Sequence, residues 1–265
     1  MKLGFIGCGN MASAIIGGII NNKIIEGSSI YVYDIYAPSS EKLNKEYSVN
    51  VAESEADVVK NADAVVLAVK PNVIGSVLSK LNITLEESDT LLISIAAGKD
   101  IKFLRSHLSH DNRIIRVMPN INAQVGAAMS AFTANEQATD EDKQFCEKVF
   151  SGVGRVMELD EGFFPLFGVI AGCSPAFAYM FIDALARAGV QNGMKKDVAL
   201  EIAAQAVLGS AEMILKSDKH PYELIDMVCS PGGTTIEGVS SLKADGFENA
   251  VNNAVKKAVE KDSKL

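Results

Sequence analysis

A glycine-rich segment near the amino terminus has the residue types and spacing that bind phosphate. Gly7, Gly9 and Ala12 form the pattern G-x-G-x-x-A. Gly7 permits a tight turn, Gly9 lets a pyrophosphate approach the backbone, and Ala12 allows a helix to pack closely on a strand. Because an expected strand precedes the pattern and an expected helix follows it, the segment favours dinucleotide binding over a purely structural loop. The residues predicted to border the dinucleotide here are Ile6, Gly7, Cys8, Gly9, Asn10, Met11 and Ala12.

An acidic residue, Asp34, ends the second expected strand. A carboxylate at this place can accept a hydrogen bond from the adenosine 2′-hydroxyl, and it would repel a 2′-phosphate. No arginine occurs in residues 35–40. The sequence therefore favours NADH over NADPH, and a solvated loop acid is the alternative interpretation.

A second glycine-containing segment, Ser230–Thr235, lies far along the chain. It has the sequence Ser-Pro-Gly-Gly-Thr-Thr and leads into an expected helix. Two glycines before a helix start bring several N–H groups to one point, and Thr234 and Thr235 can cap the helix. Because the nucleotide phosphates are already placed at the first segment, a carboxylate is the natural occupant of this anion site. An ordinary helix start after a turn is an equally good interpretation.

Short apolar runs alternate with helical patterns over the first part of the chain. Strands separated by helices pair in parallel, because only a crossover returns the chain in the same direction. With the glycine motif after the first strand, this pattern predicts an α/β Rossmann dinucleotide-binding domain over residues 1–159. The expected strands span residues 2–6, 29–33, 64–69, 90–95, 113–118 and 127–133, and the expected helices lie near 10–21, 39–46, 72–81 and after 139.

The character of the sequence changes after about Asp160. Long patterns rich in Ala, Leu and Met predict helices over residues 175–188, 196–216, 234–243 and 247–260. Residues 199–215 are apolar almost all round, which is typical of a helix buried by its own domain or by a partner chain. We therefore expect an all-helical second domain, residues 160–265, that forms a homodimer.

Composition excludes several classes of protein. The chain has 265 residues, with 33 acidic against 25 basic side chains and a net charge of −8. Such a chain should bind nucleic acid and anionic membrane surfaces weakly. We also expect no apolar run as long as a membrane span, which needs about 18 residues. The cysteines are far apart and form no C-x-x-C, so we expect neither metal binding nor disulfides. Reduced thiols and the lack of a leader-like start favour the cytoplasm.

Five short motifs occur in the order and at the separations seen in pyrroline-5-carboxylate reductases, so the chain resembles that family up to about residue 250. The motifs are Gly7–Ala12, Ala68–Pro71 (A-V-K-P), Arg116–Asn120 (R-V-M-P-N), Gly172–Ala176 (G-C-S-P-A) and Ser230–Thr235. The resemblance implies reduction of the cyclic imine 1-pyrroline-5-carboxylate to L-proline by NADPH or NADH, the last step of proline biosynthesis. It also implies two intertwined helical domains, an active site at the dimer interface, and in some members a ring of dimers.

The resemblance also assigns roles to individual residues. The N–H groups of Gly232, Gly233 and Thr234 would bind the substrate carboxylate, and the hydroxyl of Thr235 would hydrogen-bond the ring nitrogen. The substrate-binding set that it implies is Asp218, Ser230, Gly232, Gly233, Thr234 and Thr235, with Thr235 as the catalytic residue. The cofactor-binding set, besides the glycine motif and Asp34, is Ala68, Val69, Lys70, Pro71, Ala96, Ala97, Pro119 and Asn120.

The implied reaction needs little acid–base chemistry from the protein. A protonated iminium accepts a hydride far better than a neutral imine, so orientation and charge stabilisation matter more than a strong base. This agrees with the scattered positions of His107, His110 and His220, none of which is needed. Whether Thr235 donates a proton or only orients the ring stays open.

Three positions depart from the family pattern. Asp34 replaces a small hydroxyl residue that is frequent in NADPH users, and Glu55 stands where many members have an asparagine near the adenosine. Cys173 replaces the usual serine of the G-S-x-P turn, a change that alters packing little because cysteine behaves as a small apolar residue. None of the three lies in the Ser230–Thr235 segment.

Two other functions fit parts of the sequence. A Rossmann reductase for another imine or carbonyl acid typically depends on an ionisable group on a long helix, and residues 175–188 offer only Asp183 and Arg187. A nucleotide-binding sensor without turnover has no need of the second anion segment. Both alternatives are therefore weaker than the imine reductase.

Overall fold

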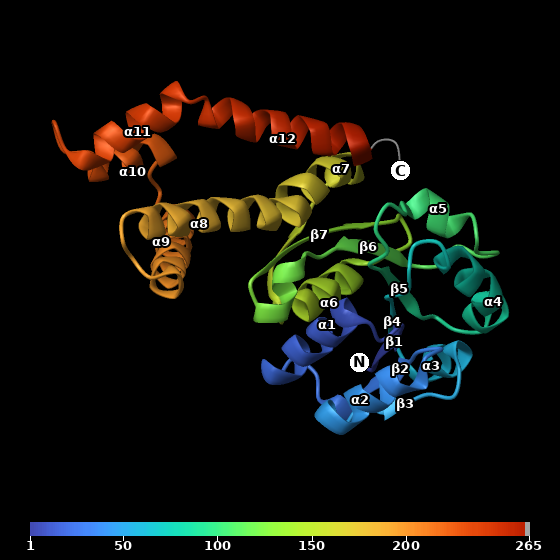
Figure 1. The fold of residues 1–265 in the computed structure, drawn as a ribbon. Helices are drawn as coiled ribbons and strands as arrows, with labels where there is room; N and C mark the ends of the chain where they lie inside the picture. Colours follow the sequence, from blue (N-terminus) through green and yellow to red (C-terminus); the bar gives the residue numbers. More distant parts are fainter. Residues whose placement is uncertain (263–265) are drawn as a thin grey trace. The chain divides into compact units, whose positions relative to one another are not determined.

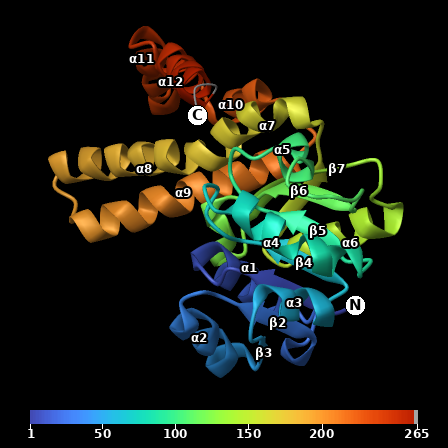
Figure 2. The same cartoon turned by 90° about the vertical axis from the view of Figure 1, so that its right-hand side faces the viewer.

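The computed structural model of the chain describes residues 1–262 and divides into two compact units. The first unit runs from Met1 to Gly172, and the second begins at Cys173. The first is a sheet covered by helices and the second consists of helices (Figure 1, Figure 2). The expected α/β domain followed by a helical domain is confirmed. Residues 263–265 of the expected second domain lie outside the described residues.

An eight-stranded sheet forms the centre of the first unit, in the order β3-β2-β1-β4-β5-β6-β7-β8. Its neighbouring pairs are parallel except β6 and β7. Those two strands are joined by the 3₁₀ helix η2 (Ile121–Val125) without a crossover, so they pair antiparallel. The strands are β1 (Leu3–Ile6), β2 (Ile30–Tyr33), β3 (Asn50–Val51), β4 (Ala64–Leu67), β5 (Leu91–Ser94), β6 (Ile114–Met118), β7 (Ala128–Ala134) and β8 (Gly154–Glu158).

Helices cover both faces of the sheet and bury two separate cores (Figure 1). Successive side chains of a strand point to opposite faces, so Phe5 of β1 lies in one core and Ile6 in the other. Strands buried on both faces are apolar throughout, which explains the short continuous apolar runs of the sequence. The helices are α1 (Asn10–Asn21), α2 (Ala37–Tyr47) and α6 (Asp140–Ser151) on one face, and α3 (Glu55–Asn61), α4 (Ile74–Glu86) and α5 (Ile101–Arg105) on the other.

The first unit continues past its last strand through a segment that packs against β6. Glu161 forms an ion pair with Arg116 of β6, and Phe164 is fully buried. Because of these contacts, the compact unit extends beyond residue 159, where the sequence places the end of the first domain. A functional boundary at that residue stays a prediction. The elements of this segment are η3 (Glu161–Phe163), α7 (Phe164–Phe167) and the π-helix η4 (Gly168–Cys173).

In the second unit, the two longest helices α8 and α9 pack side by side (Figure 2). Asp183 of α8 forms ion pairs with Arg187 of the same helix and with Lys196 at the start of α9. These charges fix one end of the helix pair. The helices of this unit are α8 (Ser174–Gln191), α9 (Lys196–Lys216), α10 (Pro221–Val228), α11 (Thr234–Ala244) and α12 (Phe247–Asp262).

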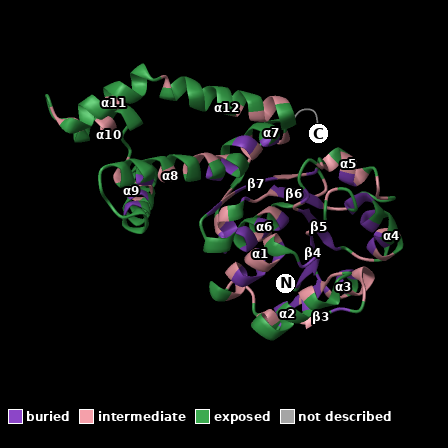
Figure 3. Ribbon diagram, viewed as in Figure 1, coloured by how far each residue is buried: buried purple, intermediate pink, exposed green. Residues whose placement is uncertain are grey.

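Most residues of the helical unit are exposed in the single chain (Figure 3). Many of them are large and apolar. Met180, Ile202 and Leu215 are each more than half exposed. Two helical stretches, Glu161–Gln191 and Lys196–Lys216, are long and apolar enough to cross a membrane, judged by length and composition alone. The expectation that no apolar run reaches this length is therefore wrong. Residues 162–182 carry no charged side chain, and the few charges of Lys196–Lys216 leave that helix apolar on average.

Candidate active site

A large cavity opens at the carboxyl edge of the sheet. Its volume is about 930 Å³, and residues that end or follow β1, β2, β4, β5 and β6 line it. β1 lies between β2 and β4, so the chain winds outward from β1 in both directions. In open α/β sheets the crevice at such a switch point is the place where ligands bind.

The glycine turn between β1 and α1 has the backbone that the sequence pattern predicts. Gly7 has φ of +97°, and a Cβ atom there would lie 2.7 Å from the carbonyl oxygen of Ala68. Only glycine adopts this conformation in so close an approach. At Gly9, in contrast, a Cβ atom would meet no protein atom within 4 Å, because it would point into open space. That space and the uncapped start of α1 fit a pyrophosphate.

The carboxylate of Asp34 is held beside the glycine turn. Its Oδ2 accepts a hydrogen bond from the backbone N–H of Cys8 at 2.7 Å, and its Oδ1 accepts one from the N–H of Tyr36 at 2.9 Å. Burial, and secondarily the negative charge of Asp34, raises the pKa of the Cys8 thiol to about 12. Cys8 is therefore neither a free N–H donor for a phosphate nor a reactive thiol.

Most of the residues predicted to bind the cofactor come together around the cavity. They come from the ends of five different strands and lie far apart in the sequence. Cys8 and Asn120 are not among the lining residues. The predicted residues that line it are Ile6, Gly7, Gly9, Asn10, Met11, Ala12, Asp34, Ala68, Val69, Lys70, Pro71, Ala96, Ala97 and Pro119.

Sequence reasoning missed one wall of the cavity, which α4 provides. Val73, Ser76, Val77 and Lys80 line it, and they have the spacing i, i+3, i+4, i+7 of one helix face. Ser76 and Lys80 are exposed, so in the sequence they read as an ordinary solvated helix face and give no signal of a site. Glu55 also lines the cavity, so a second carboxylate accompanies Asp34 there.

Asn120 has a different place from the one that the sequence predicts. Its side chain is buried, donates from Nδ2 to the carbonyl oxygen of Ala171 at 2.8 Å, and accepts at Oδ1 from the N–H of Met129 at 3.3 Å. Both ends of the amide are thus used inside the protein. The contact with a cofactor stays a prediction for this residue.

The Ser230–Thr235 segment forms a turn that opens α11 in the helical unit. The N–H of Gly233 donates to the carbonyl oxygen of Ser230 at 3.0 Å, and Gly232 has φ of +64°, as a type II turn requires. Of the N–H groups expected to bind a carboxylate, that of Gly233 is therefore engaged within the turn. The expected N–H group of Thr234 lies at the first position of α11, where a helical N–H has no helical partner. Thr235 occupies the second position.

Two details of this segment differ from expectation. Gly233 occupies the N-cap position of α11 without a side-chain cap, so the interpretation of Thr234 and Thr235 as capping residues is wrong. Both threonines are exposed and lie inside the helix instead. Asp218 is exposed in the link between α9 and α10, outside the turn.

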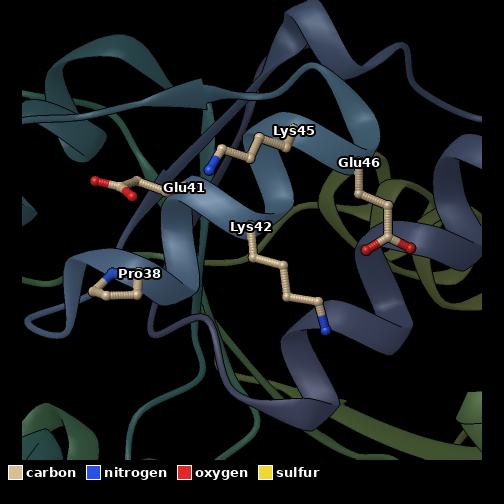
Figure 4. A pocket seen from close by; sticks show the side chains of 5 residues that line it. All are labelled: Pro38, Glu41, Lys42, Lys45 and Glu46. Atoms are coloured by element: carbon tan, nitrogen blue, oxygen red, sulfur yellow. The ribbon is translucent and has the colours of Figure 1, made fainter.

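A second hollow lies over the exposed side of α2, and side chains of this one helix line it (Figure 4). Two lysines and two glutamates contribute, so their charges cancel and give no preference for an anion or a cation. We assign it no function. The lining residues are Pro38, Glu41, Lys42, Lys45 and Glu46.

The sheet order, the glycine turn and the cavity define a Rossmann-type NAD(P)-dependent oxidoreductase. Two family models match the chain: "NADP oxidoreductase coenzyme F420-dependent" over residues 2–98, and "pyrroline-5-carboxylate reductase dimerisation" over residues 161–265. The chain is 44% identical to the pyrroline-5-carboxylate reductase of Escherichia coli strain K12, over 100% of this chain and 98% of that protein. The chain belongs to the pyrroline-5-carboxylate reductase family.

Solved structures support the same assignment. The crystal structure of Plasmodium falciparum pyrroline carboxylate reductase with NADP bound has a TM-score of 0.86 and 35% identity, covering 99% of this chain and 97% of that one. A pyrroline-5-carboxylate reductase from Coxiella burnetii has a TM-score of 0.94 and 31% identity, with the same coverage. The resemblance read from the five motifs is thereby confirmed.

Proposed function

We propose that the protein reduces 1-pyrroline-5-carboxylate to L-proline with NADH or NADPH. The observation that carries the proposal is the similarity along the whole chain to reductases of that name, in a protein that has both the nucleotide cavity and a second helix start with free N–H groups. The first feature serves the dinucleotide and the second serves a carboxylate. A sensor of nucleotide alone would not need the second.

The nucleotide would be held by the glycine turn, the start of α1 and the apolar ends of β4 and β5. When bound, the dihydronicotinamide supplies the hydride that reduces the C=N bond. Gly9 leaves room for the pyrophosphate, and Ala96, Ala97 and Pro119 would border the nicotinamide. These residues bind and orient, and none of them needs to transfer a proton.

The turn before α11 would hold the substrate. The N–H groups of Gly232 and Thr234 would bind the carboxylate, while Thr235 at the second helical position would hydrogen-bond the ring nitrogen as the catalytic residue. The positive end of the helix dipole favours a carboxylate at this place. Ser230 shapes the turn through its carbonyl, and Asp218 would provide an acidic neighbour that favours the protonated iminium.

We infer a preference for NADH over NADPH. Asp34 and Glu55 both line the cavity, and Asp34 lies where the adenosine ribose is expected. Two carboxylates repel a 2′-phosphate, whereas a carboxylate accepts readily from a 2′-hydroxyl. NADPH then remains a poorer donor.

The proposal includes a homodimer built from the helical units, with rings of dimers as a further step. The exposed apolar side chains of α8 and α9 need a covering surface, and the dimerisation model matches this part of the chain. A second copy supplies that surface in place of a lipid bilayer. We place the enzyme in the cytoplasm, where its four unpaired cysteines stay reduced, with neither nucleic acid nor membrane as partner.

The decisive experiment follows the loss of NADH and of NADPH absorbance after 1-pyrroline-5-carboxylate is added to the pure protein. We expect oxidation of both, faster with NADH, and L-proline as the product. The matched control substrate is 1-pyrroline, which has the same ring without the carboxylate and should react much more slowly. Nucleotide binding without oxidation would overturn the proposal and support the sensor, and equal rates with both imines would remove the carboxylate role of the turn.

A further inference from the structure

Asn120 connects a wall of the nucleotide cavity to a distant segment of the same unit. Its neighbours in sequence, Pro119 and Ile121, both line the cavity, whereas its own side chain does not. The amide instead donates to the Ala171 carbonyl and accepts from the Met129 N–H. The partners settle the orientation of the amide, because a carbonyl oxygen only accepts and an N–H only donates.

The carbonyl of Ala171 lies where the π-helix η4 gives way to α8. Pro175, at the start of α8, has no N–H and cannot donate to the preceding turn. Ala171 is almost fully buried, so its carbonyl has little access to water. The Asn120 amide donates to this carbonyl from outside the helix. Two of the sequence motifs, R-V-M-P-N and G-C-S-P-A, therefore meet in one hydrogen bond.

Two further contacts hold the same segment against the end of β6. Arg116 forms an ion pair with Glu161 at 2.9 Å, and its guanidinium lies over the ring of Phe164 at 4.4 Å. A Cβ atom on Gly168 would lie 3.2 Å from the sulfur of Met118, so the π-helix passes closely over that side chain. Arg116, Met118 and Asn120 follow the period of two that marks one side of an extended chain.

We propose that Asn120 is a positioning residue for hydride transfer. Its bond to Ala171 holds the Pro119–Ile121 wall of the cavity against the last turn of the sheet unit. From that turn the chain continues into the helices that carry the Ser230–Thr235 turn. The inference rests on the proposed function, because it assigns Asn120 to the reaction between the nucleotide and the substrate held by that turn. It predicts that loss of the Ala171 bond slows the reaction while nucleotide affinity is kept.

The substitution Asn120→Asp isolates this bond. An aspartate still accepts from Met129, but its ionised carboxylate cannot donate to Ala171. We expect kcat to fall by about tenfold or more, since small displacements of bound reactants are costly, while the Kd for NADH changes by less than about threefold. A protonated carboxyl can donate, so the ratio of variant to wild-type kcat should rise as the pH is lowered.

Asn135→Asp is the matched control. Asn135 lies at the other end of the β6–β7 pair, is 8% exposed against 6% for Asn120, and also uses both ends of its amide. It accepts from the N–H of Ile114 at 2.9 Å and donates to the carbonyl of Asn112 at 2.8 Å. Its variant should lose similar thermal stability but keep kcat, which separates positioning from a general loss of structure.

The pH profile supplies the rescue, because a protonated Asn120→Asp carboxyl again donates to Ala171. Asn120→Ala is the second variant if Asn120→Asp does not fold, and it too should lower kcat while the Kd for NADH is kept. The inference is overturned if the Asn120 variants keep wild-type kcat, if they weaken NADH binding as much as they slow turnover, or if the relative kcat of Asn120→Asp does not rise as the pH is lowered. If the wild-type protein itself does not reduce the imine, the proposed function fails first and the inference fails with it.

Discussion

The carboxylate of Asp34 accepts a hydrogen bond from the backbone N–H of Cys8, with 2.7 Å between Oδ2 and nitrogen. This bond holds the acid at the edge of the glycine turn, where the ribose of a dinucleotide is expected. We predict that Asp34→Ser raises the ratio of kcat/KM for NADPH to that for NADH by about tenfold or more, because it removes a charge that repels the 2′-phosphate. Initial rates with the two nucleotides measure this ratio.

Asp57→Asn is the control for that experiment. Asp57 also accepts from a backbone N–H, that of Glu53 at 3.0 Å, but it does not line the cavity. Its variant should leave the nucleotide ratio unchanged. An unchanged ratio in Asp34→Ser as well would mean that Asp34 does not meet the ribose.

The two glycines of the turn should respond differently to substitution by alanine. Gly9→Ala adds a methyl group to open space, so it should cost less than about 1 kcal/mol of unfolding free energy and still raise the Kd for NADH by about tenfold or more. Gly7→Ala forces a strained φ and a contact with Ala68, so it should lower the unfolding free energy by about 2 kcal/mol or more. Urea unfolding and fluorescence titration with NADH distinguish the two. Equal loss of stability in both variants would contradict the assignment of Gly9 to the pyrophosphate.

Thr235→Ala should impair turnover far more than nucleotide binding. We expect kcat to fall by roughly tenfold to a hundredfold, because a hydrogen bond to the reacting nitrogen is lost, while the Kd for NADH stays within about twofold. Thr84→Ala, on α4 and outside the cavity, is the matched control and should retain wild-type kcat. Full turnover in Thr235→Ala would show that the substrate turn is misassigned.

The ion pairs between α8 and α9 should make stability depend on pH in the acid range. Hydrogen bonds from Lys196 and then from Arg187 lower the pKa of Asp183 below its usual value. A lowered folded-state pKa stabilises the fold above the unfolded pKa of about 3.9, and that contribution is lost as the pH falls through the folded pKa. Asp183→Asn should therefore lower the melting temperature slightly at pH 7, and this difference should disappear toward pH 3.

The control for this measurement is Asp226→Asn, which removes a negative charge from α10 without touching the α8–α9 ion pairs. Its effect should not show the same acid dependence. Because exposed ion pairs are screened by salt, the Asp183 effect should also shrink at high ionic strength. A difference for Asp183→Asn that persists unchanged at pH 3 would contradict the ion-pair explanation.

The strands could be predicted from the sequence because burial on both faces makes them continuous apolar runs. Their ends were harder to place. The expected strand 64–69 ends at Leu67 in the structure, and Ala68 and Val69 leave the sheet to line the cavity. That wall is itself apolar, so hydropathy does not mark where the strand ends. The sequence does not predict β3, α3, α5, α7 or α10, because elements of two to eight residues are too short for a clear period.

The candidate site divides in the same way between local and distant interactions. The glycine turn and Asp34 follow from local spacing, because each residue acts through its own backbone or at a strand end. The hydrogen bond of Asn120 could not be predicted from local spacing, since the carbonyl to which it donates lies 51 residues further along the chain. The hydrogen bond of the Gly233 N–H could not be predicted either, because two adjacent glycines allow several turns and only the folded structure shows which one forms.

The cavity at the switch point gathers segments from Ile6 to Gln124 around one ligand. A nucleotide in this place acts as a non-covalent cross-link between stretches that must separate when the sheet unit unfolds. At a free concentration one hundred times its Kd, such a ligand adds about 2.7 kcal/mol to the free energy of unfolding. The concentration of free dinucleotide would then set the stability of this protein as well as its rate.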